Sequence, residues 1–570
     1  MILWKPTGLL DISTNASDLP EVSAQFSTTS EALTRCKNLR QAQTGVTKLR
    51  DGSSKINASA INTAIWLLME QAGTRYAFAG DSIYRNEVSI ASGLTQAQWS
   101  AIKYNQFNDT DQQIFALNGT DRKRINSTTV AEWGITAPSA APTTAVGAST
   151  GLTGDYSAKT TYCRKVGSVV VSESNPSADG TTRTLTNDSF SVTWVASSDS
   201  QVTHVRVYRT LADGLVYFHD QDIAVGTLTV DTNTTDANLG NELETDHDRP
   251  PLGSFVLGPN FDGTSFILKD NLLYFSKAQQ PEYWPATSFV EIGPPQLPNK
   301  SACFYNGQTY VGNKADLYNV LGTASGTFLP VKMQARTGVE GIFGMVSVSG
   351  YGIFHTGNDG VYLFAGGQDI NYTYAMFYPI FRGETVNGMP AVSEMESAVL
   401  HSDGTYLYFA YTSSGSYSPF PTNVIVLNLE TKKLAYYVYN DGSDIAVRCM
   451  VNDETNKRVL IGDNTGFVRK IQDTSVTTDS GTAISWETQS KDFTLSTRPH
   501  FPRWQKYDVD ASGATSCTGS LLLDGETHQE HTIIGNRVVK RRLVPEGNGE
   551  RCAIKLSGSG PISIYAVESE

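Results

Sequence analysis

The sequence predicts an all-β protein built around a β-propeller, and two observations carry that prediction. First, residues 255 to about 475 repeat one pattern, in which apolar and aromatic residues alternate for a few positions, stop at a turn, and alternate again. Alternation with a period of two is typical of strands that bury one face. Second, these strand pairs recur every ~40 to 50 residues, which is the spacing of propeller blades.

The turns between the strands support the same prediction. Asn306-Gly307 follows the apolar residues 302–305, and Asp403-Gly404 precedes residues 406–409. Asn, Asp and Gly accept the positive φ angles that tight hairpin turns need. A radial stack of small sheets buries such two-faced strands without long open edges. We therefore expect about six or seven blades, with residues 61–135 as the first part of the propeller and 255–480 as the remainder.

Length, composition and net charge limit the number of domains and the class of protein. The chain has 570 residues, of which 39% are hydrophobic, so several packed domains are expected. No apolar run approaches the ~18 residues of a membrane span, and the N-terminus lacks the charged and apolar regions of a secretory signal. The net charge of −13 argues against condensation of the whole chain onto DNA or an acidic membrane.

The first 60 residues differ in charge from the rest. Residues 31–55 carry six basic side chains against two acidic ones. A basic stretch in an acidic protein can contact nucleic acid or an acidic neighbour. It can equally be a solvated strand and loop, and the sequence leaves both interpretations open.

A Pro-, Ala-, Ser- and Thr-rich linker at 136–150 marks a domain boundary. Residues 150–248 then form a self-contained β segment, which we predict to be a β-sandwich inserted between two propeller segments. Its turn at 173–177 resembles that of fibronectin type III modules. This segment holds 14 acidic and 6 basic residues, a net charge of −8. Residues 481–570 are predicted to close the chain with a second sandwich-like β segment.

The six cysteines are at least 35 residues apart and form no CxxC pair. This spacing favours scattered buried thiols in a protein made in a reducing cytoplasm over a disulfide or zinc framework.

Enzyme signatures are missing from the sequence. Sialidase-type Asp-boxes need a fixed spacing and a Trp, which the turns around Asp359 and Asp403 lack, so we interpret both as hairpin turns. There is also no Gly-x-Ser-x-Gly elbow, Walker loop or His-Glu-x-x-His motif. We assign no catalytic, cofactor-binding or metal-binding residues and predict that the chain is not an enzyme.

Weak metal and ligand signals have plainer explanations. His528 and His531 lack two further ligands and are interpreted as part of an exposed loop. The run from Asp231 to Glu242 has the length of a calcium loop but lacks its glycine and flanking helices. Residues 246–248 are interpreted as a solvated loop, and Trp284, which could stack on a sugar, as a core residue.

Several short motifs carry a resemblance to a known family. They are 35–38 with 45–52, 115–121, 272–276 with 282–285, and 491–493 with 503–504 and Gly525. Together they resemble the tail nozzle, or tail tubular protein B, family of short-tailed bacteriophages (podoviruses), over most of the chain outside the insert.

The resemblance implies a structural virion component of the phage tail. Copies would form a homo-oligomeric ring, a hexamer in such proteins, around the DNA ejection channel. The chain ends, 1–60 and 481–570, would build a platform toward the head-to-tail adaptor, and the ring would link that adaptor to tail fibres or a tail needle. DNA would pass through without specific binding. The alternative is a receptor-binding or glycan-binding tail propeller, possibly with depolymerase activity.

Overall fold

The computed structural model describes the chain except residues 25–26, 42–44, 106–111, 323–326, 414–419, 495–502, 536–537, 544–548 and 570. The described residues are mostly strand and turn, with two short helices, α1 (Tyr374–Phe381) and the 3-10 helix η1 (Asp236–Asn238). Neither reaches the length and apolarity that crossing a membrane requires. The chain divides into two compact units: unit 1 (Met1–Gln96, Val311–Leu317 and Lys332–Glu570) and unit 2 (Ala97–Tyr310 and Tyr318–Val331).

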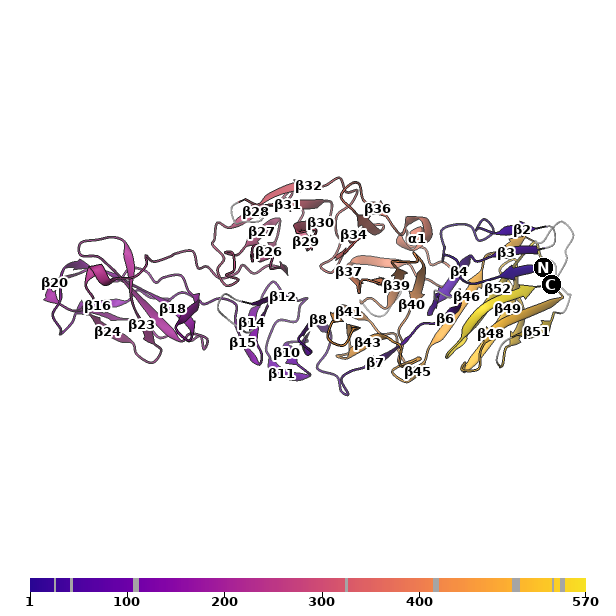
Figure 1. Ribbon diagram of the computed structural model, residues 1–570, viewed down its shortest axis with the longest axis horizontal. Helices are drawn as coiled ribbons and strands as arrows, with labels where there is room; N and C mark the ends of the chain where they lie inside the picture. Colours follow the sequence, from indigo (N-terminus) through magenta and orange to yellow (C-terminus); the bar gives the residue numbers. More distant parts are fainter. Residues whose placement is uncertain are drawn as a thin grey trace. The chain divides into compact units, whose positions relative to one another are not determined.

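Seven blade-type sheets follow one another along the described part of the chain (Figure 1), and the fold is an all-β propeller, as the sequence predicts. Three of these sheets come wholly or mostly from unit 2. The first consists of β12 (Ser100–Asn105), β13 (Gln112–Leu117), β14 (Arg122–Asn126) and β15 (Thr129–Glu132), and the second of β25 (Phe255–Leu257), β26 (Phe266–Lys269), β27 (Leu272–Phe275) and β28 (Phe289–Glu291). The third consists of β29 (Asn299–Tyr305), β30 (Gln308–Asn313), β31 (Leu317–Leu321) and β32 (Leu329–Lys332).

Unit 1 contributes the other four blades. They are β8 (Ile65–Gln71), β9 (Thr74–Ala79), β10 (Ser82–Arg85) and β11 (Val88–Ala91); β33 (Met345–Val348), β34 (Gly352–Gly357), β35 (Gly360–Phe364) and β36 (Ile370–Asn371); β37 (Val392–Ser402), β38 (Tyr406–Ser413), β39 (Asn423–Asn428) and β40 (Leu434–Tyr437); and β41 (Val447–Asp453), β42 (Arg458–Asp463) and β43 (Val468–Asp473) with the N-terminal strand β7 (Gly52–Lys55).

Strand β7 completes the last blade. It pairs antiparallel with β43, with Lys55 opposite Arg469 and Ser54 opposite Lys470. The completed blade then packs against the first one, because residues of β8 and of β41 to β43 share one buried apolar cluster. An N-terminal strand therefore closes a C-terminal sheet, although the sequence places residues 1–60 in the platform.

The predicted hairpin turns have the backbone that their residues favour. Asn306 and Gly307 have φ angles of 49° and 74°, and Gly404 of the Asp403-Gly404 turn has a φ angle of 88°. Two consecutive positive φ angles are what a type I′ hairpin turn requires. Local turn chemistry thus sets the pairing of the strands on either side.

Both chain ends build the platform, defined here as β1–β6 and β46–β53. Strand β1 pairs with β3 and β53, and β4 pairs with β46 and, at one residue, with β40 of a blade. Indigo and yellow strands accordingly interleave in Figure 1. The N-terminal strands are β1 (Ile2–Trp4), β2 (Val22–Ala24), β3 (Ser27–Ser30), β4 (Leu33–Lys37), β5 (Leu39–Gln41) and β6 (Thr47–Leu49). The C-terminal strands are β46 (Ser485–Ser490), β47 (Phe493–Thr494), β48 (Trp504–Asp510), β49 (Ser516–Leu523), β50 (Glu526–Thr532), β51 (Val539–Arg542), β52 (Arg551–Ser559) and β53 (Ser563–Ser569), preceded by the small strands β44 (Thr478–Asp479) and β45 (Thr482–Ala483) beside β7.

The insert is a β-sandwich within unit 2. One sheet has the order β19-β18-β22-β23, and its partners are β16-β21-β24 and β17-β20. Residues of both sides, among them Tyr156, Phe190 and Val207, share one buried core. The strands are β16 (Thr143–Val146), β17 (Leu152–Tyr156), β18 (Ala158–Val166), β19 (Val169–Glu173), β20 (Arg183–Asp188), β21 (Phe190–Thr193), β22 (His204–Thr210), β23 (Tyr217–Ala224) and β24 (Thr229–Thr232).

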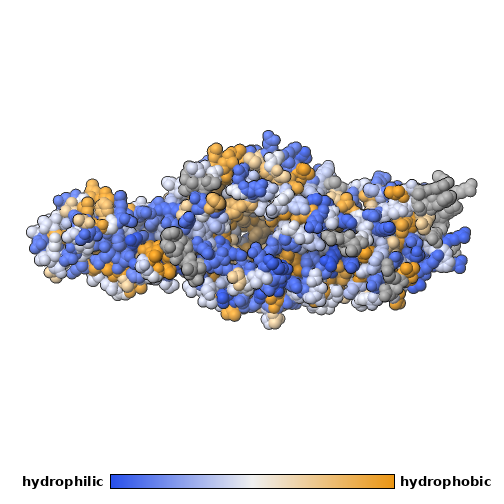
Figure 2. Space-filling model, viewed as in Figure 1, coloured by the Kyte–Doolittle hydropathy of each residue, from blue (hydrophilic) through white to orange (hydrophobic). Residues whose placement is uncertain are grey.

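The surface is mostly polar. Figure 2 shows hydrophilic residues over much of the visible face, with apolar residues in smaller patches. Large exposed apolar side chains include Val22 and Ile534 of the platform, 73% and 77% exposed, and Leu215 of the insert, 91% exposed. These positions are candidates for contacts with other molecules.

The pairing of β7 depends on a missing side chain. A Cβ atom on Gly52 would lie 2.2 Å from the Thr478 carbonyl oxygen, which is closer than atoms can approach. We expect Gly52→Ala to displace β7 and to lower the free energy of unfolding by about 1–3 kcal/mol, as overpacking does. Urea denaturation measures the change. Gly367→Ala is the control, because nothing lies within 4 Å of a Cβ there, and equal stability of both variants would contradict the assignment.

Candidate functional site

A buried arginine joins the platform to the propeller within unit 1. Arg50 follows β6, and its guanidinium is fully buried against Asp479, with Nη2 to Oδ2 and Nη1 to Oδ1 distances of 2.5 and 3.1 Å. Its remaining N–H groups donate to Asn38 Oδ1 and to the carbonyl oxygens of Val438 and Asp51, each at 3.0 Å. All five donors of the guanidinium therefore have acceptors.

The carboxylate side of this pair is equally satisfied. Asp479 also accepts hydrogen bonds from the Ser53 hydroxyl at 2.8 Å and from the Asn440 backbone N–H at 3.0 Å. The Tyr439 ring lies 4.3 Å from Arg50 Cζ. The pair thus ties the N-terminal segment, the chain beyond β40 and the start of the C-terminal segment together in one network.

A second buried charge cluster, formed by Glu282, Arg164 and Arg124, holds the base of the insert, called its root below, against the blades of unit 2. Glu282 lies in the connection between β27 and β28 and is 2% exposed. Its Oε1 accepts from Arg164 Nη2 of β18 at 2.5 Å and lies 3.7 Å from Arg124 Nε of β14. Arg124 also donates to Gln113 and to Gln201 of the insert. The insert is therefore anchored to two blades through one carboxylate.

Aromatic residues surround this anchor. Trp133 and Trp284 both donate their indole N–H to the Pro281 carbonyl oxygen at 2.8 Å, and their rings meet edge to face at 5.7 Å. Trp284 is 2% exposed, so its interpretation as a core residue is confirmed. His247 stacks on Tyr283 with ring centroids 4.0 Å apart. The same short segment therefore contacts both the blades and the chain that returns from the insert.

The turn at 173–177, noted in the sequence for its fibronectin-like pattern, fixes that returning chain. Asn175 donates from Nδ2 to Asp248 Oδ1 at 2.7 Å and accepts from the His247 backbone N–H at 2.8 Å. One amide side chain therefore joins the β19–β20 connection to the end of the insert.

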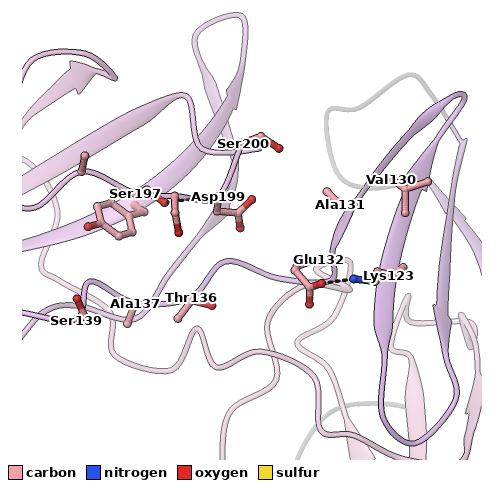
Figure 3. A pocket seen from close by; sticks show the side chains of 13 residues that line it. Lys123, Val130, Ala131, Glu132, Thr136, Ala137, Ser139, Ser197, Asp199 and Ser200 are labelled. Carbon is pink, nitrogen blue, oxygen red and sulfur yellow. Dashed lines mark hydrogen bonds and ion pairs between the residues drawn. The ribbon is translucent and has the colours of Figure 1, made fainter. Parts of the chain in front are cut away.

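Next to the root lies a cleft of about 530 Å³ (Figure 3). It is bounded by the β14–β15 hairpin, the linker at 136–139 and the insert loop at 196–200. The loop presents Ser197, Asp199 and Ser200, and across from it Lys123 pairs with Glu132. Hydroxyl groups, the Asp199 carboxylate and the Lys123–Glu132 ion pair can hydrogen-bond a polar ligand or water. The lining residues include neither histidine nor cysteine, so they offer no imidazole base or thiol nucleophile.

One group of possible metal ligands emerges among the described residues, namely Glu244, Asp246 and His247. The Lys277 ammonium already lies between them, 2.9 Å from Glu244 Oε2 and 2.5 Å from Asp246 Oδ1. The hydrogen bond from Lys277 lowers the pKa of Glu244. This cluster is an ion-pair network in which Lys277 supplies the positive charge, and it fixes the returning linker to the β25–β28 blade.

The structure does not form a metal site from the calcium-like run at 231–242 or from the pair His528 and His531. Asp231 lies in β24, whereas the Asp236 carboxylate accepts from Arg209 Nη1 at 2.8 Å, so the calcium-like run does not wrap around a common centre. His528 and His531 lie half-buried in strand β50, which corrects the prediction of an exposed loop. Residues 526–532 are all polar, so the sequence shows no apolar alternation that would indicate this strand.

The predicted hairpin turns and thiols are confirmed. Asp359 lies between β34 and β35, and Asp403 between β37 and β38, where its carboxylate accepts from the backbone N–H groups of Thr405 and Tyr406. All six cysteines are free and buried. Burial raises the pKa of the Cys36 thiol to about 12, so it stays protonated and unreactive at neutral pH.

Sequence reasoning missed the two charge anchors. Arg50 and Asp479 are separated by 429 residues, and Arg164 and Glu282 by 118. No local spacing marks such partners. The only indication was the basic stretch at 31–55. Arg50 in that stretch is fully buried, so it is neither a solvated residue nor one exposed for contact with nucleic acid or an acidic neighbour.

Comparisons with known proteins add little to this description. No protein-family model and no curated protein matches the chain. Among solved structures, the chain is similar to Kluyveromyces lactis Hsv2, with a TM-score of 0.24 and 9% sequence identity. The match covers 49% of this chain and 67% of that chain. Another similar structure is the extracellular domain of a hybrid two-component system from B. thetaiotaomicron (TM-score 0.27, 10% identity, 92% of this chain and 77% of that one). At these TM-scores the likeness carries no argument about function.

The fold and the anchors therefore define the class of this protein by themselves. It is a multi-domain, all-β propeller protein whose chain ends share sheets and whose insert is held by a buried carboxylate.

The Arg50 network generates a stability prediction. Asp479→Asn leaves the guanidinium buried without its counter-charge, and we expect it to cost about 3–5 kcal/mol of unfolding free energy. Urea denaturation followed by tryptophan fluorescence measures this loss. Glu568→Gln, which breaks a partly exposed pair with Lys506, is the control and should cost about 0–1 kcal/mol. Equal losses of unfolding free energy in the two variants would show that the Arg50 network does not stabilise the junction between the platform and the propeller more than a surface ion pair does.

A second prediction concerns acid stability of the insert. Burial by itself would raise the pKa of Asp222, but hydrogen bonds from His219, Lys165 and Arg206, at 2.8 to 2.9 Å, lower it overall. A folded-state pKa below the unfolded value, about 3.9, stabilises the fold above that pH. The contribution is lost as pH falls through the folded-state pKa.

Calorimetry between pH 7 and pH 3 tests this linkage. We expect Asp222→Asn to be less stable than the native chain at pH 7 and to lose less stability on acidification. Asp231→Asn, at an exposed position of the same insert, should follow the native profile. If Asp222→Asn and the native chain lose stability in parallel, the Asp222 network does not contribute.

Proposed function

We propose that the chain is a structural component of a short phage tail, made in the host cytoplasm and incorporated into the virion. Copies form a ring around the DNA ejection channel and link the adaptor to distal tail parts, such as fibres or a needle. The sequence motifs that resemble tail nozzle proteins suggest this role and a hexameric ring. Its mechanism is mechanical, and we assign it no catalytic step.

One observation supports this role above the others. The two chain ends form a single platform in which β53 lies between β1 and β48, and β4 bridges a blade strand and β46. The apolar core runs on from the platform into the blades, with Trp4, Tyr437 and Ile554 in one cluster. A part that connects an adaptor to a distal tail must carry load across such a junction without opening.

Charge is compatible with a channel for DNA. The chain has a net charge of −13, and many of its arginines are neutralised in buried pairs, as Arg50, Arg209 and Arg469 are. Phosphates bind where unpaired lysines and arginines gather. A channel through such a ring would let DNA slide instead of holding it.

Exposed apolar residues of the platform are the candidate contacts between copies. Val22 on β2 and Ile534 after β50 are each more than 70% exposed. The buried centre of a protein–protein interface is more apolar than the rest of the protein surface. We place the contact between neighbouring copies on this part of the platform.

Negative-stain microscopy combined with light-scattering mass tests the proposal on the full-length chain, alone and mixed with adaptor-bearing tails. We expect rings with a central hole, or occupancy at the tail tip. Ile534→Glu should disrupt the rings because it buries a charge at the contact, whereas Leu215→Glu on the insert should leave them intact. A particle that stays monomeric both alone and with the tails would contradict the proposal.

A further inference from the structure

The β33–β36 blade carries a cavity that the proposed function does not use. Its volume is about 310 Å³, at the small end of ligand pockets, which span about 300–1,000 Å³. It lies wholly within unit 1, between the chain that enters the blade, the β34–β35 turn, the outer strand β36 and the start of α1. The lining residues are Arg336, Asp359, Tyr362, Gln368, Asp369, Ile370, Asn371 and Tyr374.

The cavity combines apolar surface with planar polar groups. Tyr374 and Ile370 at its rim are 54% and 65% exposed, which leaves one aromatic and one aliphatic side chain open to solvent. The polar lining consists of a guanidinium, two amides, two carboxylates and two tyrosine hydroxyl groups. A sugar ring has the matching chemistry, because its C–H face packs on an aromatic ring while its hydroxyl groups both donate and accept hydrogen bonds.

The base of the cavity is held rigid by buried contacts. Asp369 is buried, its Oδ1 accepts from the Arg336 backbone N–H at 2.7 Å, and its Oδ2 lies 3.4 Å from His355 Nε2. His355 in turn bonds the Gly338 carbonyl oxygen at 2.9 Å and stacks on Tyr362. These contacts hold the Arg336 backbone and the side chains of Asp369 and His355 in place before any ligand arrives, which reduces the entropy cost of binding.

At the opposite side, the Tyr362 hydroxyl donates to Asp359 Oδ1 at 2.5 Å. Burial and this hydrogen bond raise the pKa of Tyr362 to about 12, so the hydroxyl stays protonated. Asn371 donates from Nδ2 to the Asp359 carbonyl oxygen at 3.3 Å. The Asp359 turn, which the sequence suggests only as a hairpin, therefore also shapes a cavity wall.

The exposed charges of the cavity narrow the choice of ligand. Asp369 is 1% exposed and lies 3.4 Å from the buried His355. The charges that a ligand meets at the cavity surface are therefore one guanidinium, Arg336, and one carboxylate, Asp359. These two charges are opposite in sign, which favours a neutral ligand.

From this geometry we propose that the cavity binds a neutral saccharide unit. Tyr374 stacks on the ring face, and Arg336, Asn371 and Asp359 hydrogen-bond its hydroxyl groups. A tail component with this site would contact neutral glycans, and the inference stands whether or not the chain forms rings.

Saturation-transfer NMR on the full-length chain tests the proposal. The probes are methyl glucoside, methyl galactoside and N-acetylglucosamine, with glucuronate as the charged comparison. We expect signal transfer to at least one neutral probe and weaker transfer to glucuronate. Absence of transfer to all three neutral probes, or preference for glucuronate, would overturn the proposal.

Variants locate the binding. Tyr374→Ala and Arg336→Gln should each weaken the affinity for the bound probe at least tenfold, with little change in melting temperature because both side chains are exposed. Phe261→Ala, which removes an exposed aromatic ring outside the cavity, should leave affinity unchanged. Retained affinity in both cavity variants, or equal loss in Phe261→Ala, would refute the site.

Discussion

The buried pair of Arg50 and Asp479 is the constraint on which the rest of unit 1 depends. A guanidinium removed from water is tolerated only if every donor finds an acceptor, and here those acceptors come from chain segments more than 380 residues apart. The first 55 residues must therefore be in place before the last blade and the platform are complete. The same short stretch supplies β7 to the last blade and β4 to the platform.

The insert follows the same principle on a smaller scale. Glu282 is almost fully buried, and two arginines from different strands approach it. Around it, Asn175 and Lys277 fix the chain where it leaves the sandwich. A domain joined to a blade by flexible linkers alone would move freely, whereas this root is held by a buried carboxylate and two tryptophans. The insert is therefore suited to present its acidic surface at a defined position.

The proposed mechanical role and the proposed saccharide site are compatible because they use different residues of the chain. The Arg50–Asp479 and Arg164–Glu282 ion pairs are buried between chain segments. The cavity near Tyr374 opens beside β36, an outer strand of one blade. The anchor residues Arg50, Asp479 and Glu282 are charged and buried, and at Arg50 every guanidinium donor has an acceptor, as a fixed joint requires. Residues at the cavity are partly exposed and polar, as a weak and reversible contact requires.

The sequence by itself determined the fold class and most local structure. Alternating apolar residues and turns such as Asn306-Gly307 act over a few positions, so strands and hairpins could be predicted from neighbours alone. The polar strand around His528 escaped because it lacks that alternation. Only the tertiary structure decided that β7 joins the last blade, that Arg50 meets Asp479 and that Arg336 and Tyr374 line one cavity. Those contacts depend on how distant segments meet in space, which no local pattern specifies.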